Sequence, residues 1–326
     1  MRRAVVTGLL GQDGSYLAEL LTAEGVEVHG LVRPQLSPRS AAIGHRLTAR
    51  GCRPALHALD LGNADAVGRL LRDLKPDEIY HLAAEHHSAE TLRSIGAIED
   101  RFAVNTERTR ILLAAAWSLP STPACIVASS SKIFDASPSS PQTEATPIAT
   151  RSAYGTARAD ELHLVRSFRA RGLPVSAAIL YNHESPRRPA AFVSRKIVST
   201  LVQIRAGQRS TLTLGDLDTE ADWGYARDYC EAMTLLARHS EPTDMIIAAG
   251  TARPVRAWVE QAAELLGIGP WERYVRVDPD LVPSSGVTLT GVPTHAERTL
   301  GWERSVPFED LVALMVDEEL RSPWPV

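Results

Sequence analysis

Short apolar runs alternate with longer amphipathic stretches over the first half of the chain. The runs predict strands at residues 4–7, 26–32, 56–59, 78–82, 125–129 and 175–180. Tyr16, Leu17, Leu20 and Leu21 show helical spacing and predict a helix after the first strand, and similar patterns predict helices at 64–74, 105–116 and 154–171. Strands and helices that alternate in this way are typical of an α/β fold, here a Rossmann-type, doubly wound parallel sheet.

A glycine-rich turn joins the first predicted strand to the first helix. Gly8, Gly11 and Gly14 have the spacing G-x-x-G-x-x-G. Such glycines give a tight turn, let the backbone approach a pyrophosphate, and allow the helix to pack closely on the sheet. The helix N-terminus adds N–H groups and a positive dipole end. The turn therefore predicts a dinucleotide site.

The pattern becomes irregular from about residue 182. Pro186 and Pro189 interrupt it, short strands are expected near residues 212–214 and 245–248, and helices near 228–238 and 255–266. We therefore expect a dinucleotide-binding Rossmann domain at residues 1–181 and mainly a smaller α/β substrate-binding cap at residues 182–326.

Composition narrows the class of protein. The 326 residues are 44% hydrophobic and 23% charged, with a net charge of −4, which favours a globular enzyme over a nucleic-acid-binding protein. No apolar run is long enough to span a bilayer, and Met1, Arg2 and Arg3 lead directly into the first strand. The three cysteines lie far apart, so we expect a cytoplasmic protein without disulfides. Adjacent His86 and His87 cannot face one way on a strand, so we expect no metal.

Several stretches resemble the extended short-chain dehydrogenase/reductases, and most closely the GDP-mannose 4,6-dehydratase family. The resemblance covers nearly the whole chain. It is carried by residues 7–33 (TGLLGQDGSYLAELLTAEGVEVHGLVR), 60–61, 78–84 (EIYHLAA), 181–196 (YNHESPRRPAAFVSRK), 214–229 and 293–302.

The resemblance implies a cofactor site along the carboxyl ends of the strands. Gly8, Gly11, Gln12, Asp13 and Gly14 would hold the pyrophosphate, Asp60 and Leu61 the adenine, and Leu82, Ala83 and Ala84 the nicotinamide half, with His183 and Arg188 around the cofactor. Arg33 matches the arginine that binds the 2′-phosphate of NADP. No acidic residue ends the second strand, which favours NADP. Pro34 stands where the family has a second arginine, so NAD stays possible.

The resemblance also implies catalytic residues, two of which depart from the family. Tyr154 would exchange a proton while a hydride moves to the nicotinamide. The family has a lysine four residues later, which holds the cofactor ribose and activates the tyrosine, whereas this chain has Arg158. A guanidinium keeps the positive charge and the donors. Ser130 would supply a hydroxyl to the sugar. Lys132 occupies the position of the glutamate that removes the sugar C5 proton.

An ammonium is not a base at neutral pH, so Lys132 leaves three alternatives open. Burial could lower its pKa, Glu85 or His86 could act as the base, or no elimination occurs. The substrate would be a small molecule, most plausibly a nucleotide sugar, with Glu85, His86, Asn182, Arg195 and Lys196 as substrate-binding candidates. Ala221, Val282 and Ser285 replace charged residues of the family and weaken the case for a diphosphate.

From these residues we expect an NADP-dependent enzyme of the dehydratase type, oxidising a sugar carbon through Tyr154. The alternatives are a C4 dehydrogenase, reductase or epimerase without dehydration, and a cofactor-binding pseudoenzyme. The family forms dimers and tetramers, so the resemblance implies a homodimer or homotetramer.

Overall fold

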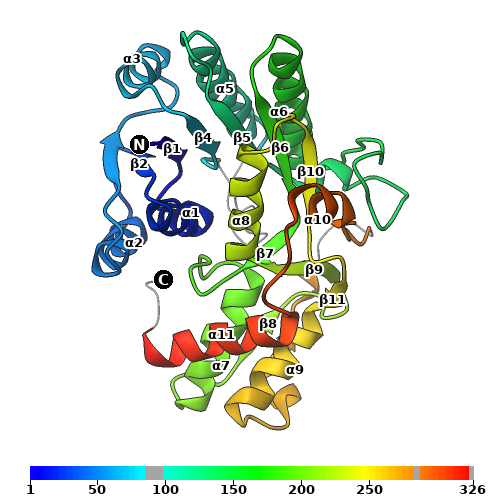
Figure 1. Cartoon of the computed structure of the whole chain (residues 1–326). Coiled ribbons are helices and arrows are strands. Elements are labelled where there is room, and N and C mark those ends of the chain that lie inside the picture. The colour runs from blue at the N-terminus through cyan, green and yellow to red at the C-terminus, as the bar shows by residue number, and fades with distance from the viewer. Residues whose placement is uncertain (85–97, 282–286, 323–326) are drawn as a thin grey trace.

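The computed structural model describes residues 1–84, 98–281 and 287–322. In this part of the chain, seven parallel strands form one sheet in the order β10-β6-β5-β4-β1-β2-β3 (Figure 1). Their bounds are β1 (Arg3–Thr7), β2 (Glu27–Val32), β3 (Ala55–Ala58), β4 (Glu78–His81), β5 (Ala124–Ser130), β6 (Val175–Leu180) and β10 (Asp244–Ile247). The six strands expected in the first half of the chain are confirmed to within one residue at each end.

Helices cover both faces of the sheet. One face carries α3 (Ala64–Leu74), α5 (Ile98–Trp117) and α6 (Ala153–Ala170), and the other carries α1 (Gln12–Ala23) and α8 (Ala226–Ala237). Side chains of β1 alternate between the two cores, because Val5 packs on the first face and Ala4 and Val6 on the second. The doubly wound α/β class is thereby confirmed.

Helix α2 (Pro38–Ala49) lies in a stretch for which the sequence analysis predicts no helix. Ser37 precedes the helix, and its side chain accepts a hydrogen bond from the backbone of Ser40. Proline at the first helical position is compatible with a helix, because its missing N–H would have had no partner there.

The cap contains two small sheets and the remaining helices. One sheet joins β7 (Asn182–Glu184), β9 (Glu220–Tyr225) and β11 (Ala252–Pro254), and the other joins β8 (Leu212–Leu214) and β12 (Val275–Val277). The helices of the cap are α7 (Val193–Arg205), α9 (Val255–Leu266), α10 (Thr294–Leu300) and α11 (Phe308–Arg321), and its short 3₁₀ turns are η2 (Trp271–Arg273) and η3 (Pro279–Leu281). A further 3₁₀ turn, η1 (Ser131–Phe134), follows β5 of the large sheet.

Strand β10 and helix α8 do not belong to the cap, and placing them there from the sequence is wrong. The strand pairs with β6, with Met245 opposite Ala178, and it forms the edge of the large sheet. Helix α8 packs against α1. The apolar strand provides β6 with a second hydrogen-bonded neighbour. The chain thus returns to the Rossmann part after residue 182, and a division at that residue does not separate two compact units.

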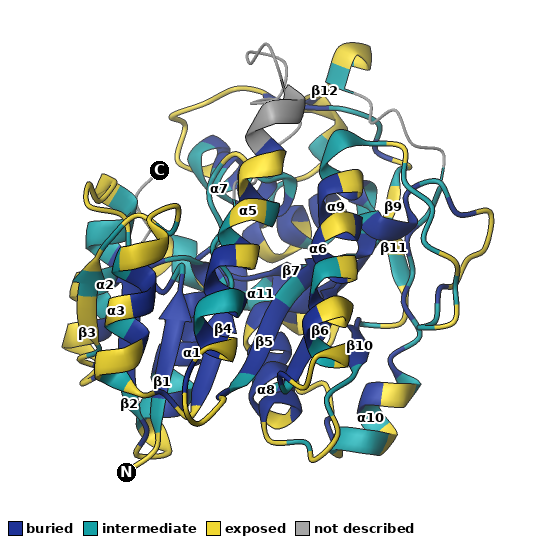
Figure 2. Ribbon diagram, turned by 90° about the horizontal axis from the view of Figure 1, so that it is seen from above, coloured by how far each residue is buried: buried dark blue, intermediate teal, exposed yellow. Residues whose placement is uncertain are grey.

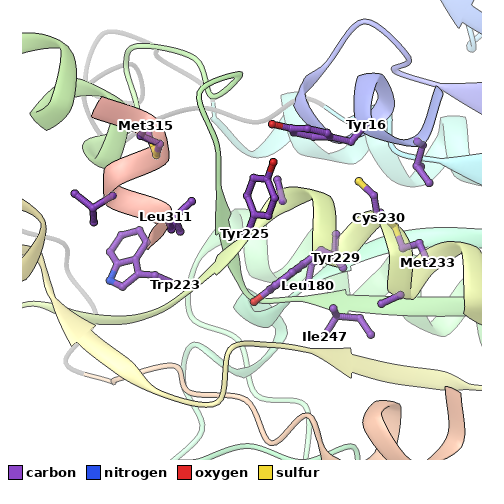
Figure 3. Close-up of a cluster of buried hydrophobic side chains, with 14 of the residues drawn as sticks. Tyr16, Leu180, Trp223, Tyr225, Tyr229, Cys230, Met233, Ile247, Leu311 and Met315 are labelled. Carbon is purple, nitrogen blue, oxygen red and sulfur yellow. The ribbon is translucent and has the colours of Figure 1, made fainter. Parts of the chain in front are cut away.

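One hydrophobic core runs from the α1 and α8 face of the sheet into the cap (Figures 2 and 3). Tyr16 of α1 meets Tyr225 of β9 edge to face, with ring centroids 5.8 Å apart. Leu311 and Met315 extend the same cluster into α11. Among the described residues, no helix combines the length and the apolar character that a membrane crossing needs.

Candidate functional site

The residues expected to bind ligands follow the carboxyl ends of neighbouring parallel strands. The glycine turn follows β1, Leu82 to Ala84 follow β4, Ser130 ends β5, and Tyr181 follows β6. Because these strands are parallel, all four segments lie at the same edge of the sheet, which is where open α/β sheets bind ligands.

The glycine turn has no room for side chains. Gly8 has a φ of +70°, and a Cβ on Gly14 would lie 2.4 Å from the carbonyl oxygen of Gly8 and 2.5 Å from Cα of Leu9. Gly11 precedes α1, whose start has no side-chain cap. This closely packed turn leads into a helix N-terminus with N–H groups that no cap occupies, so it fits the pyrophosphate of a dinucleotide.

The first turn of α1 is joined to the segment after β6 by side-chain contacts. Nε2 of His183 lies 3.0 Å from a carboxylate oxygen of Asp13, and Nδ1 donates to the carbonyl oxygen of Tyr181 at 2.7 Å. The amide of Gln12 donates to the carbonyl oxygen of His183 and accepts from Ser185. These contacts fix the edge of the expected pyrophosphate site.

Electrostatics favour the charged forms of Asp13 and His183. Burial acts against both charges, but the partner outweighs it in each case. The pKa of Asp13 is therefore lowered by His183, and the pKa of His183 is raised by Asp13. The pair is a partly buried ion pair at the helix N-terminus, where an anion is favoured.

Two of the expected adenine-side segments lie where the sequence placed them. Arg33 is exposed directly after β2, and Asp60 and Leu61 follow β3. The carboxylate of Asp60 accepts from the backbone of Gly62 at 3.0 Å, and it lies 3.7 Å from a guanidinium nitrogen of Arg108. No acidic residue ends β2.

The two arginines that follow β7, Arg187 and Arg188, have different partners. Arg187 is buried, pairs with Glu19 at 2.7 Å and lies over the ring of Tyr16, so its role is to hold this segment against α1. The charge of Arg187 is therefore buried and is not solvated at the surface. Arg188 pairs with Glu184 at 3.2 Å and stacks on Phe192.

Arg195 has contacts that do not suit the role expected for it. Its guanidinium is buried, lies 2.6 Å from Glu319 of α11 and donates to the carbonyl oxygen of Pro186. It therefore links α7 to α11. Lys196 is half-buried on α7, and Asn182 is half-buried on β7.

Ser130 and Lys132 lie at the end of β5. The Ser130 hydroxyl accepts a hydrogen bond from the backbone of Lys132 at 3.3 Å and caps η1. A Cβ on Gly155 would lie 2.5 Å from the carbonyl oxygen of Lys132, so this lysine borders the residue after Tyr154. Burial lowers the pKa of Lys132, and the nearby Asp135 offsets part of that effect.

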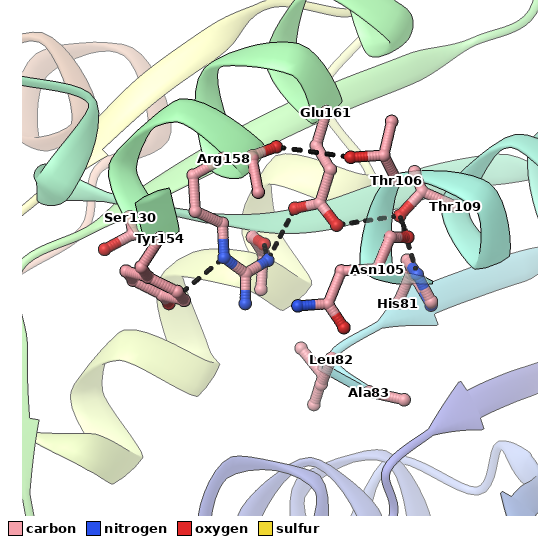
Figure 4. Close-up of polar contacts among 12 residues, drawn as sticks. His81, Leu82, Ala83, Asn105, Thr106, Thr109, Ser130, Tyr154, Arg158 and Glu161 are labelled. Carbon is pink, nitrogen blue, oxygen red and sulfur yellow. Dashed lines mark hydrogen bonds and ion pairs between the residues drawn. The ribbon is translucent and has the colours of Figure 1, made fainter. Parts of the chain in front are cut away.

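The structure brings Tyr154 and Arg158 together at the start of α6 (Figure 4). Nε of Arg158 donates to the hydroxyl of Tyr154 at 3.0 Å, and Nη1 donates to the carbonyl oxygen of Ala128 at 3.2 Å. Nη1 also lies 2.7 Å from the carboxylate of Glu161. Burial lowers the pKa of Arg158, but Tyr154 and Glu161 outweigh it and raise that pKa, so the guanidinium stays charged.

Sequence reasoning missed the residues behind Arg158. These are Glu161 on α6, Thr109 on α5, His81 at the end of β4 and Thr7 at the end of β1. Glu161 lies three residues after Arg158 and seven after Tyr154, on the same side of the helix. That spacing is the one signal in the sequence that could have found it. Glu85, His86, Val282 and Ser285 lie outside the described residues.

Comparisons with known proteins agree with the fold and with the family that the sequence resembles. The sequence profile of the family described as GDP-mannose 4,6 dehydratase matches residues 5–315. GDP-mannose 4,6 dehydratase 2 of Arabidopsis thaliana is 37% identical over 326 residues, which cover 97% of this chain and 86% of that protein. The human GDP-mannose 4,6 dehydratase is 36% identical, and the match covers 97% of this chain and 91% of that protein.

Solved structures share the fold at lower identity. UDP-glucose 4-epimerase from Bifidobacterium longum, in complex with NAD⁺ and UDP, has a TM-score of 0.84 at 17% identity, covering 98% of this chain and 99% of that one. dTDP-glucose 4,6-dehydratase from Bacillus anthracis, in complex with NAD, has a TM-score of 0.81 at 16% identity, covering 99% and 98%. At these identities the likeness is one of fold.

Proposed function

The chain belongs to the GDP-mannose 4,6-dehydratase family, and on that premise we propose an NADP-dependent enzyme that oxidises a carbon of a nucleotide sugar through Tyr154 and then eliminates water. The observation that carries the proposal is the hydrogen bond from Nε of Arg158 to the Tyr154 hydroxyl, 3.0 Å long. It supplies a positive charge and a donor to the phenol oxygen, as an acid/base tyrosine requires.

Tyr154 takes the proton of a sugar hydroxyl while the carbon that bears this hydroxyl is oxidised. Arg158 cannot accept a proton from the phenol, because a guanidinium only donates. It therefore keeps its donor and its positive charge beside the phenol oxygen and leaves Tyr154 itself as the group that exchanges the proton with the sugar. When bound, NADP would supply the hydride acceptor and, later, the hydride donor.

The chain's own residues favour NADP over NAD. Arg33 follows β2, and no carboxylate stands there to bind a free 2′-hydroxyl. Gly8, Gly11 and Gly14 would face the pyrophosphate, and Leu82 and Ala83 would border the nicotinamide half.

Elimination needs a base beside the new ketone, and we assign it to Lys132. Burial lowers the pKa of this lysine, and its backbone carbonyl oxygen borders Gly155, the residue after Tyr154. As a neutral amine, its Nζ would take the proton from C5, and the C6 hydroxyl would leave as water after taking a proton from solvent. When a hydride then returns to C6, the ammonium of Lys132 would return a proton to C5. The substitution of glutamate by lysine is also the observation that favours the second candidate, redox chemistry at C4 without dehydration.

The test is incubation of the purified protein with NADP and GDP-mannose, followed by absorbance at 340 nm and identification of the sugar product. We expect a 4-keto-6-deoxy product. Tyr154→Phe should lower turnover by about 10²–10⁴-fold, because proton transfer is lost. Tyr274→Phe, a tyrosine of the cap, is the matched control and should keep wild-type turnover.

Lys132→Met separates the two candidate functions. In this variant the oxidation step should continue, while uptake of solvent deuterium at C5 and formation of the product should stop. If the wild-type protein shows hydride exchange with the sugar but forms no dehydrated product, the C4 oxidoreductase replaces the dehydratase. Bound NADP with no turnover of any nucleotide sugar would point to the pseudoenzyme.

A further inference from the structure

We infer that Glu161 is a positioning residue that holds Arg158 in the orientation in which its Nε reaches Tyr154. The inference rests on the proposed role of Tyr154 and adds a residue to that same site. Glu161 is 2% exposed and Arg158 is 7% exposed, so solvent does not hold the guanidinium in place and the contacts with the protein must do so.

The contacts of Arg158 divide between the two sides of its guanidinium. Nη1 is held by the carboxylate of Glu161 at 2.7 Å and by the carbonyl oxygen of Ala128 at 3.2 Å. Because a guanidinium is planar and rigid, fixing Nη1 also fixes the direction of the Nε–H bond. That bond points to the Tyr154 hydroxyl (Figure 4). The charged contact to Glu161 is the stronger of the two anchors.

Glu161 is itself fixed through its second oxygen. Oε1 of Glu161 accepts from the hydroxyl of Thr109 at 3.2 Å, and this hydroxyl shares its hydrogen with the backbone carbonyl oxygen of Asn105 at 3.0 Å. The Thr109 oxygen lies 3.0 Å from Nε2 of His81. Nδ1 of His81 lies 2.8 Å from the hydroxyl of Thr7. All of these residues are buried, and they come from α6, α5, β4 and β1.

The number of available hydrogen atoms determines which group donates in each of these hydrogen bonds. The Thr7 oxygen accepts the backbone N–H groups of Leu82 and Ala83, each at 3.1 Å. Its own hydrogen is therefore available to Nδ1 of His81, and Nε2 carries the ring proton and donates to Thr109. Burial, with Arg158 and Arg108 adding to it, lowers the pKa of His81 to about 3, so the ring is neutral.

The same hydrogen bonds join the Tyr154 side of the site to the nicotinamide side. Thr7 holds the backbone of Leu82 and Ala83, and the series of contacts ends at Arg158 and Tyr154. The carboxylate of Glu161 accepts a hydrogen bond from the neutral Thr109 hydroxyl and also forms the ion pair with Arg158. Removing its carboxylate therefore leaves Nη1 with the Ala128 carbonyl alone among the contacts described here, and the guanidinium becomes able to turn away from Tyr154.

The experiment compares Glu161→Met, which removes both acceptors, with Glu161→Gln, which keeps the shape and one acceptor. Asp160→Ala is the matched control, because Asp160 is an exposed acidic residue on the same helix. Each variant is loaded with NADP. The Nε–H resonance of Arg158 is observed by ¹⁵N NMR and assigned by its absence in Arg158→Lys and its shift in Tyr154→Phe. Its exchange with water, kcat and KM are then measured.

In Glu161→Met we expect the Arg158 Nε–H resonance to lose the shift due to Tyr154. We also expect kcat to fall by about 100-fold with little change in KM, since displacement of a catalytic contact acts on the chemical step. Glu161→Gln should exchange its Nε–H about tenfold faster than wild type and lose less kcat, because a neutral acceptor holds a guanidinium more weakly. Asp160→Ala should match wild type in every measurement.

A folded Glu161→Gln or Glu161→Met variant that keeps both the wild-type resonance and the wild-type kcat overturns the inference. If Glu161→Met does not fold, the Glu161→Gln variant still decides. If the wild-type protein turns over no sugar, the proposed function fails, whereas the resonance of Arg158 still reports whether Glu161 positions it. The two failures are therefore distinguishable.

Discussion

At the scale of single residues, Arg158 illustrates how a buried side chain depends on partners that match its charge and its donors. A guanidinium has five donors in a fixed plane, and the contacts described here use Nε and Nη1 for Tyr154, Glu161 and the Ala128 carbonyl. A lysine has no planar fork, so a contact at one of its donors would not fix the direction of another. The buried charge of Arg158 is matched by Glu161, because an unpaired charge in this position would be strongly destabilising.

Asp13 and His183 form the residue pair whose effect should depend most clearly on pH. The pKa of His183 is raised above 6.5, so its contribution is full below pH 6.5 and is lost as the pH rises through the raised value. The pKa of Asp13 is lowered below 3.8, so its contribution is present above pH 3.8 and is lost as the pH falls through the lowered value. The pair should therefore be most stabilising between pH 3.8 and pH 6.5, where both contributions are full.

A double-mutant cycle with Asp13→Asn and His183→Gln measures this coupling in the protein without cofactor. From urea unfolding we expect a coupling free energy of roughly 1–2 kcal/mol at about pH 5.5, typical of a hydrogen bond between charged groups. It should decrease at about pH 9. A coupling that is constant over this range would mean that the interaction does not depend on the charge of His183.

At the scale of elements, the junction of β1 and α1 depends on the absence of a side chain at Gly14. A Cβ there would meet backbone atoms of Gly8 and Leu9 at 2.4 and 2.5 Å, and backbone atoms cannot move aside as the end of a flexible side chain can. We expect Gly14→Ala to reduce the free energy of unfolding by about 1–3 kcal/mol, as overpacking does, and to weaken NADP binding.

Gly44→Ala is the control for that variant. Gly44 also lies inside a helix, but its Cβ would meet only a side-chain carbon of Leu10, at 3.7 Å. Alanine is the better helix former, so we expect a gain of about 0.5–1 kcal/mol. Chemical denaturation and NADP titration check both variants, and equal stabilities for the two would contradict the close packing at Gly14.

At the scale of the whole molecule, the Rossmann part and the cap share a hydrophobic core. Tyr16 of α1, Tyr225 of β9 and Leu311 of α11 belong to one cluster, and β10 and α8 come from the C-terminal half of the sequence. Neither part can therefore lose its structure without exposing apolar surface of the other.

We expect a single cooperative unfolding transition. Trp117 is the only tryptophan before residue 182, so tryptophan fluorescence reports mainly on the C-terminal half, whereas far-UV circular dichroism reports on all helices and strands. The two urea transitions should have the same midpoint. Loss of fluorescence at a distinctly lower urea concentration would show that the cap unfolds by itself.

The sequence by itself determined the features that depend on neighbouring residues. Apolar runs located the strands of the large sheet, and glycine spacing located the turn before α1, since a strand, a helix or a tight turn is set by local geometry. The matched motifs also made Tyr154 and Arg158 catalytic candidates, and these residues are one helical turn apart.

Only the tertiary structure decided the features that depend on contacts between distant segments. A short apolar run near residue 245 is compatible with either domain, and its pairing with β6 places it in the large sheet. The sequence makes Arg195 a substrate-binding candidate, but its guanidinium pairs with Glu319 of α11. Glu161 gains its role because α6 turns that side toward β5 and α5, and the local pattern of hydrophobic and polar residues does not contain that information.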